Sequence, residues 1–254
     1  MKKTVLAIFV LLLKCPLVAQ EDMHAIHVMV ALCDNKYQGI VKVPKAIGNG
    51  QDPHNNLYWG CGYGVRTYFR KSTDWKEVRR HEVDSVILER IVFKHKTGNY
   101  YLVADAYDGK NIKDCTIAFL ESCAGMKSDT LMIGEDVVGI SGKAKAIAYI
   151  GHNGLMDFTL RNIYDNRDGK TRDAIILACA SKQYFKPYLQ SAGANPLLWT
   201  IHLMAPEAYT LYDAVDAYMR NENAEEVRSK AAAAYSKYQK CSLNAAKRLI
   251  VTGW

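Results

Sequence analysis

The sequence of 254 residues lacks several short motifs that would assign it to common protein classes. No CxxC pair occurs among the seven cysteines, which disfavours a zinc ribbon. No GxSxG elbow occurs, which disfavours a serine hydrolase of that type, and no internal repeat is apparent. Residues 60–64 are rich in glycine but lack the GxGxxG spacing, so we interpret them as a close-packed segment of a helix rather than a dinucleotide site.

Long runs of basic residues are also absent. The chain carries 33 Lys and Arg against 26 Asp and Glu, a formal net charge of +7. Three of the lysines lie in a predicted leader, so 30 basic residues remain in the mature chain and its charge is +4. Mild positive charge without a nucleic-acid motif is ordinary for a soluble protein, and we expect no nucleic-acid partner.

The apolar stretch that opens the chain, residues 4–13, is too short to span a bilayer as a helix. Basic residues precede it and small residues follow near Ala19, so residues 1–20 are predicted to be a secretory signal peptide. We therefore expect an exported protein, periplasmic or extracellular, with no integral membrane segment after cleavage. Residues 21–254 suit a single α/β domain that ends in helices over about 207–250.

Three short apolar segments predict strands that are covered on both faces: residues 27–32, 146–150 and 174–178. Each is followed by residues that can do chemistry: Cys33, Asp34 and Asn35, then His152 after one glycine, then Cys179. Since function collects at the carboxyl ends of parallel strands, we expect these three ends to converge in one crevice. The predicted fold class is α/β, a mostly parallel sheet flanked by helices on both faces.

Other segments complete the predicted architecture. A polar loop over residues 39–56 precedes a helix over about 57–70, for which Asn56 is a candidate cap. Asp114 is a candidate cap for a second helix that ends near Gly125. The remaining predictions are strands over 86–94, 99–106 and 197–204, and helices over 182–191, 208–221 and 224–250.

Cys179 and His152 form a candidate nucleophile and base. A thiol attacks only as the thiolate, and a neighbouring imidazole can lower its free pKa of about 8.5 and later give the proton to a leaving group. The helix predicted just after Cys179 would add a positive dipole end near the sulfur. Backbone N–H groups of Gly154 and Cys179 are candidates for an oxyanion hole. A disulfide between Cys33 and Cys179 is the structural alternative.

The residues around this pair resemble the caspase-hemoglobinase superfamily, the clan CD cysteine peptidases that include caspases, legumains and gingipains. In that family one hydrophobic strand ends in His-Gly and a later strand ends in Ala-Cys. Here Ile150-Gly151-His152-Asn153-Gly154 and Leu177-Ala178-Cys179-Ala180-Ser181 occupy those places in the same order. The resemblance implies a caspase-like sheet, His152 as general base and acid, Cys179 as nucleophile, and no cofactor or metal.

The resemblance also implies a substrate pocket built from the loop after the first strand and the loop after the strand beyond the cysteine. The residues that we predict to bind substrate are Asp34, Asn35, Asn153, Ser181 and Trp199.

Two functions follow from the sequence. The first is an exported cysteine endopeptidase that cleaves a polypeptide through an acyl-enzyme on Cys179. The second is a catalytically inactive caspase-like module that uses residues 39–56 to bind a protein or cell-surface partner. Replacing Cys179 or His152 would abolish labelling by an acylating probe only under the first.

Overall fold

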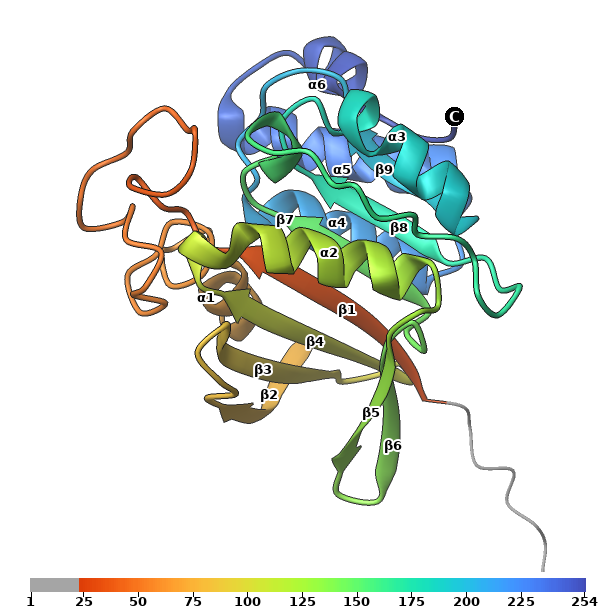
Figure 1. Cartoon of the computed structure of the whole chain (residues 1–254). Coiled ribbons are helices and arrows are strands. Elements are labelled where there is room, and N and C mark those ends of the chain that lie inside the picture. Colours follow the sequence, from red (N-terminus) through yellow and green to blue (C-terminus); the bar gives the residue numbers. More distant parts are fainter. Residues whose placement is uncertain (1–22) are drawn as a thin grey trace, which may run out of the picture.

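The structure is a computed structural model that describes residues 23–254, so the predicted signal peptide lies outside the described residues. An eight-stranded sheet with the order β10-β9-β8-β7-β1-β4-β3-β2 forms its centre (Figure 1). The strands are β1 His24–Ala31, β2 Trp75–His81, β3 Ile87–His95, β4 Tyr100–Tyr107, β7 Ala146–Ile150, β8 Asp173–Leu177, β9 Asn195–Thr200 and β10 Ile250–Val251. From β4 through β9 neighbouring strands run parallel, while β2, β3 and β10 are antiparallel to their neighbours. The predicted α/β class with a large, mostly parallel sheet is confirmed.

Helices cover both faces of this sheet (Figure 1). One face carries α1 Val65–Arg70, α4 Ala208–Met219, α5 Ala224–Gln239 and α6 Leu243–Leu249, and the other carries α2 Ile112–Cys123 and α3 Ser181–Ala192. Along β1, Val28 and Val30 enter the first core while Met29 and Ala31 enter the second. Alternate side chains of a strand point to opposite faces, so a strand covered on both sides must be apolar throughout.

The predicted central strands agree with the structure to within a few residues, but three polar strands were missed. β2 lies at the edge of the sheet and most of its side chains are polar or charged, as is common for edge strands. β5 Ser128–Ile133 and β6 Asp136–Ser141 form a separate two-stranded hairpin that projects from the body in Figure 1. β5 has no buried side chain, and β6 buries only Val138, Ile140 and Ser141 around Gly139, so neither forms the continuous apolar run on which the prediction relied.

The helix predicted over residues 57–70 begins only at Val65. Gly60 and Gly64 lie in tight turns before it, where an added Cβ would lie 1.8 Å from the His54 carbonyl oxygen and 2.4 Å from the Trp59 carbonyl carbon, respectively. The glycine-rich segment thus permits close backbone approach in turns rather than packing of a helix on the sheet. Asn56 accepts from the N–H groups of Cys33 and Tyr58 instead of capping a helix.

Two further helix boundaries differ from the prediction. α2 starts at Ile112 after a 3-10 turn, Gly109–Asn111, that Asp108 caps, and Asp114 lies within its first turn. The helix predicted over 224–250 ends after Gln239, because Lys240 adopts a left-handed conformation (φ 52°), and Ser242 caps α6. The strand predicted over 197–204 also ends earlier, at Thr200, and the chain beyond it runs to the site described below.

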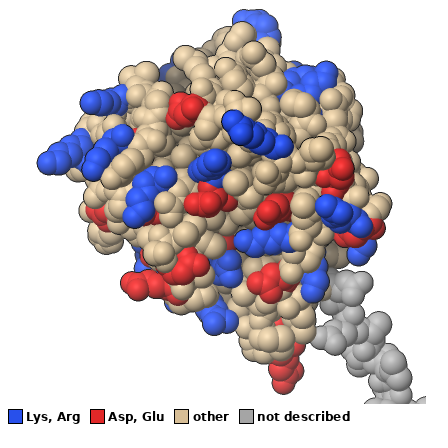
Figure 2. Space-filling model, viewed as in Figure 1, with Lys and Arg blue, Asp and Glu red and all other residues tan. Residues whose placement is uncertain are grey.

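Over residues 23–254, no helix has both the length and the apolar character needed to cross a membrane. On the face shown in Figure 2, Lys and Arg side chains are intermixed with Asp and Glu, so this face presents no broad surface of one charge.

Candidate active site

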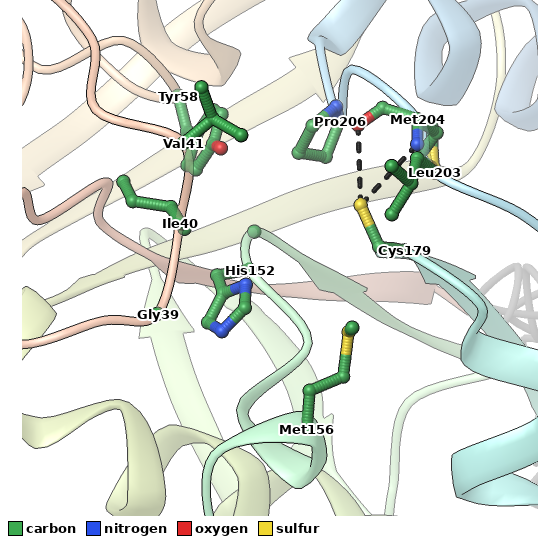
Figure 3. A pocket seen from close by; sticks show the side chains of 11 residues that line it. Gly39, Ile40, Val41, Tyr58, His152, Met156, Cys179, Leu203, Met204 and Pro206 are labelled. Carbon is green, nitrogen blue, oxygen red and sulfur yellow. Dashed lines mark hydrogen bonds between the residues drawn. The ribbon is translucent and has the colours of Figure 1, made fainter.

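The carboxyl ends of β1, β7 and β8 lie side by side, as predicted, because β7 pairs in parallel with both of the others. A pocket of about 250 Å³ opens at these ends (Figure 3). His152 and Cys179 both line it, and Figure 3 shows them facing one cavity. The other lining residues are Gly39, Ile40, Val41, Tyr58, Gly151, Met156, Leu203, Met204 and Pro206.

Gly151 brings His152 to the pocket by a turn that requires glycine. Its φ is +140°, and an added Cβ would lie 2.6 Å from the carbonyl oxygen of Ala31 on the neighbouring strand β1. The imidazole is only 6 % exposed and its Nε2 lies 2.8 Å from Asp157 Oδ2. Within residues 23–254 the other ring nitrogen, Nδ1, has no hydrogen-bond partner. His152 is therefore anchored at one nitrogen and free at the other.

Cys179 lies in a sharp turn between β8 and α3. Ala180 takes a left-handed conformation (φ 47°), and α3 begins at the next residue, so the thiol lies beside the N-terminal end of a 12-residue helix. The sulfur accepts from the Met204 N–H at 3.4 Å and donates to the Met204 carbonyl oxygen at 3.6 Å. Among the described residues it makes no hydrogen bond to His152.

Asn153 joins the two strand ends that carry the pair. Its Nδ2 donates to the Cys179 carbonyl oxygen at 2.7 Å, and its Oδ1 accepts from the Leu155 N–H at 3.1 Å. The side chain is fully buried and does not line the pocket, so the predicted contact with substrate has no support from its position and stays a prediction. It fixes the position of Cys179 relative to His152.

The side chains of Asp34 and Asn35 also lie outside the pocket, where they form hydrogen bonds with backbone groups of the following loop. Asp34 is buried, and its Oδ1 accepts from the N–H groups of Lys36 and Tyr37. Asn35 exchanges two hydrogen bonds with the backbone of Val43. Neither lines the pocket. They shape the loop that brings residues 39–41 there, so the predicted loop does contribute, through different residues.

Ser181 and Trp199 are buried and lie outside the pocket lining. The Ser181 hydroxyl donates to the Ile176 carbonyl oxygen at 3.0 Å, and the Trp199 Nε1 donates to that of Gly253 at 3.0 Å. Both therefore hold neighbouring elements together, and their role in binding substrate stays a prediction. The loop after β9 instead contributes residues 203–206 to the pocket.

The predicted oxyanion donor Gly154 is also placed elsewhere. It starts a 3-10 turn, Gly154–Met156, its backbone N–H lies next to the Tyr149 hydroxyl, and it does not line the pocket. The Cys179 N–H has no hydrogen-bond acceptor among residues 23–254, so this half of the predicted oxyanion hole remains available.

Asp157 is the functional candidate that sequence reasoning missed. Its Oδ2 accepts from His152 Nε2 and also from the Gly39 N–H at 2.9 Å. The carboxylate therefore orients the imidazole and ties it to the loop that forms the pocket wall. The sequence feature that could have indicated this role is an acidic residue, Asp157, five positions after His152.

The six cysteines of the described chain are free thiols, so the alternative disulfide between Cys33 and Cys179 is not formed. Burial raises the pKa of the Cys33 thiol to about 11. Within residues 23–254, no group of three or more His, Cys, Asp or Glu side chains is placed to hold a metal ion.

Comparison with known protein families, with curated proteins and with solved structures gives no match for this chain. The resemblance to the caspase-hemoglobinase superfamily therefore depends on its two motifs and the order of its strands.

Proposed function

We propose that this protein is an exported cysteine endopeptidase, similar to the caspase-hemoglobinase superfamily, with Cys179 as nucleophile and His152 as general base and acid. The observation that carries the proposal is that these two side chains line one pocket at the ends of adjacent parallel strands. His152 is held there through its Nε2, which is hydrogen-bonded to Asp157. A histidine oriented by a carboxylate beside a nucleophile is one of the arrangements that support acyl transfer.

In this mechanism, His152 Nδ1 takes the thiol proton and the thiolate attacks the peptide carbonyl carbon. As the S–C bond forms, the Cys179 N–H is placed to stabilise the negative oxygen. His152 then gives its proton to the leaving amine as the C–N bond breaks, and water releases the acyl group by the reverse proton transfer. Asp157 orients the imidazole that takes the proton, while the Met204 N–H and the start of α3 lie beside the sulfur.

Substrate binding must turn the thiol from the Met204 carbonyl toward His152, because the two catalytic groups are not hydrogen-bonded in this structure. Catalytic hydrogen bonds are often loose without substrate and tighten when it binds. The left-handed Ala180 next to the thiol is the kind of local strain that concentrates at functional sites.

The second candidate is a catalytically inactive binding module. The bond between Cys179 and the Met204 carbonyl favours it, since the thiol donates there and not to His152. The same pocket would then serve as a binding surface for a protein or cell-surface partner.

Site-resolved alkylation of the reduced protein by limiting iodoacetamide at pH 6 separates the two. Under the peptidase proposal Cys179 reacts at least tenfold faster than Cys241, a partly exposed reference thiol, and His152→Ala removes the difference. Cys115 and Cys123 serve as internal controls, because burial raises the pKa of both thiols. Equal labelling of Cys179 and Cys241, unchanged in His152→Ala, would support the binding module instead.

A further inference from the structure

The pocket beside Cys179 is apolar apart from the catalytic candidates themselves. Seven of its lining side chains are aliphatic, thioether, proline or tyrosine: Ile40, Val41, Tyr58, Met156, Leu203, Met204 and Pro206. Among the lining residues of the described chain there is no Asp, Glu, Lys or Arg. Figure 3 shows Ile40, Val41 and Tyr58 on one side of the cavity and Leu203, Met204 and Pro206 on the other.

Several of these side chains are unusually open to solvent. Val41 is 90 % exposed, Leu203 is 71 % exposed and Met156 is 42 % exposed, although all three surround the same cavity. Single exposed apolar residues are ordinary, but a group gathered around one cavity is typical of a surface that another molecule covers.

The acidic residues that flank the pocket in sequence are already engaged. Asp157, next to Met156, accepts from His152 and Gly39. Glu207, next to Pro206, accepts from the Tyr209 hydroxyl at 2.8 Å and the Gln239 amide at 3.1 Å, and burial raises the pKa of its carboxyl. Each carboxylate makes these bonds through one oxygen, Oδ2 of Asp157 and Oε2 of Glu207, so a lysine or arginine of a substrate would have to compete with partners already in place.

The size of the pocket matches one side chain rather than a whole ligand. An apolar cavity of about 150 Å³ accommodates benzene. A pocket of about 250 Å³ therefore has room for a side chain as large as leucine, methionine or phenylalanine. Placing a charged side chain there would remove it from water without a partner, which is costly.

We propose that the pocket receives an apolar side chain of leucine, methionine or phenylalanine size, belonging to the substrate residue whose carbonyl Cys179 attacks. This inference rests on the proposed peptidase function. The argument is geometric. Met204 contacts the Cys179 sulfur, and Leu203 and Met204 line the pocket. The side chain of the attacked residue is carried by the Cα next to the reacting carbonyl carbon, so it lies close to the sulfur and can enter this pocket. His152 then faces the leaving amine.

The test uses peptidyl chloromethyl ketones that differ only in the residue next to the reactive group, which is leucine, lysine, aspartate or glycine. The measured quantity is the second-order rate of Cys179 alkylation in the full chain. We expect leucine to react at least tenfold faster than each of the others. Val41→Glu should lower the leucine-to-lysine ratio about tenfold, while the matched control Val137→Glu, at an exposed valine on β6, should leave the ratio unchanged.

Equal rates for the four probes, or faster reaction with lysine, aspartate or glycine, would overturn the apolar assignment. Iodoacetamide carries no such side chain, so its His152-dependent reaction with Cys179 tests the peptidase proposal separately. A chain that keeps that reaction but prefers a charged probe loses the apolar assignment and keeps the peptidase function. A chain without that reaction loses both.

Discussion

Asp157 Oδ2 lies 2.8 Å from His152 Nε2 and 2.9 Å from the Gly39 nitrogen. One carboxylate oxygen thus links the candidate general base to the wall of the pocket that faces it. If substrate moves the loop at residue 39, the same contact adjusts the imidazole, so pocket occupancy and base orientation are coupled through a single atom.

Replacing Asp157 with asparagine keeps the shape of the side chain but removes its charge. The imidazolium that forms when His152 accepts the thiol proton is then less stable, so we expect iodoacetamide labelling of Cys179 at pH 6 to fall about tenfold or more. Asp165→Asn is the matched control, because Asp165 is exposed and, among residues 23–254, its side chain bonds only the Ser191 hydroxyl. An unchanged labelling rate in Asp157→Asn would remove Asp157 from the mechanism.

Gly39→Ala should disturb the same contact from the opposite side. A Cβ at residue 39 would lie 2.4 Å from Asp157 Oδ1, so the carboxylate must shift, and its other oxygen is the one that bonds His152. We expect labelling of Cys179 to slow several-fold while the melting temperature changes little. Gly62→Ala provides the comparison, because a Cβ at residue 62 meets nothing within 4 Å. Equal labelling rates for the two variants would show that Asp157 tolerates the displacement.

The placement of His152 and Cys179 at neighbouring strand ends was predictable because it depends on local pattern. An unbroken apolar strand buried on both faces must be followed by a turn, and the first reactive side chains after β7 and β8 are His152 and Cys179. Asp157 was not predictable in the same way. It lies in an irregular segment, where no periodicity indicates which way a side chain points.

The predicted substrate residues show a related limit. Asn153 and Ser181 are polar residues beside His152 and Cys179. In the structure their side chains donate hydrogen bonds to backbone carbonyl oxygens, and their position in the sequence gives no indication of these bonds. The residues that do line the pocket are apolar and lie in loops, where sequence alone does not separate them from core residues. For the fold, the strands buried on both faces were predicted, while the edge strand β2 and the hairpin strands β5 and β6 were not.

Asn153→Ala should lower stability as well as activity. The substitution leaves the Cys179 carbonyl oxygen and the Leu155 N–H without their partners in a buried setting, which costs about 1–3 kcal/mol. We expect a lower free energy of unfolding in urea. Asn162→Ala, at an exposed asparagine, should be close to neutral. Wild-type stability in Asn153→Ala would mean that the two strand ends are fixed by other contacts.

The acid stability of the protein should depend on Asp105, which is buried on β4. Arg90 donates to both of its oxygens, at 2.5 Å and 2.6 Å, and His27 Nε2 lies 3.0 Å from Oδ2. Because the His27 Nδ1 accepts from the Ser141 N–H at 3.0 Å, the neutral ring carries its proton on Nε2 and donates it to Asp105. Burial alone would raise the pKa of Asp105, but these hydrogen bonds outweigh it and lower the pKa to about 2.

A carboxyl whose pKa is lower in the folded than in the unfolded state stabilises the fold above its unfolded pKa, and that contribution disappears as the pH falls through the folded pKa. For Asp105 the loss should occur between about pH 4 and pH 2 and amount to about 2 kcal/mol. We expect the free energy of unfolding, measured in urea across this range, to fall less steeply in Asp105→Asn than in the wild type.

The variant should also start from a lower free energy of unfolding, because Arg90 loses its buried partner. Glu135→Gln, at an exposed turn, should keep the wild-type slope. Parallel slopes in Asp105→Asn and the wild type would mean that other carboxyls govern the acid unfolding.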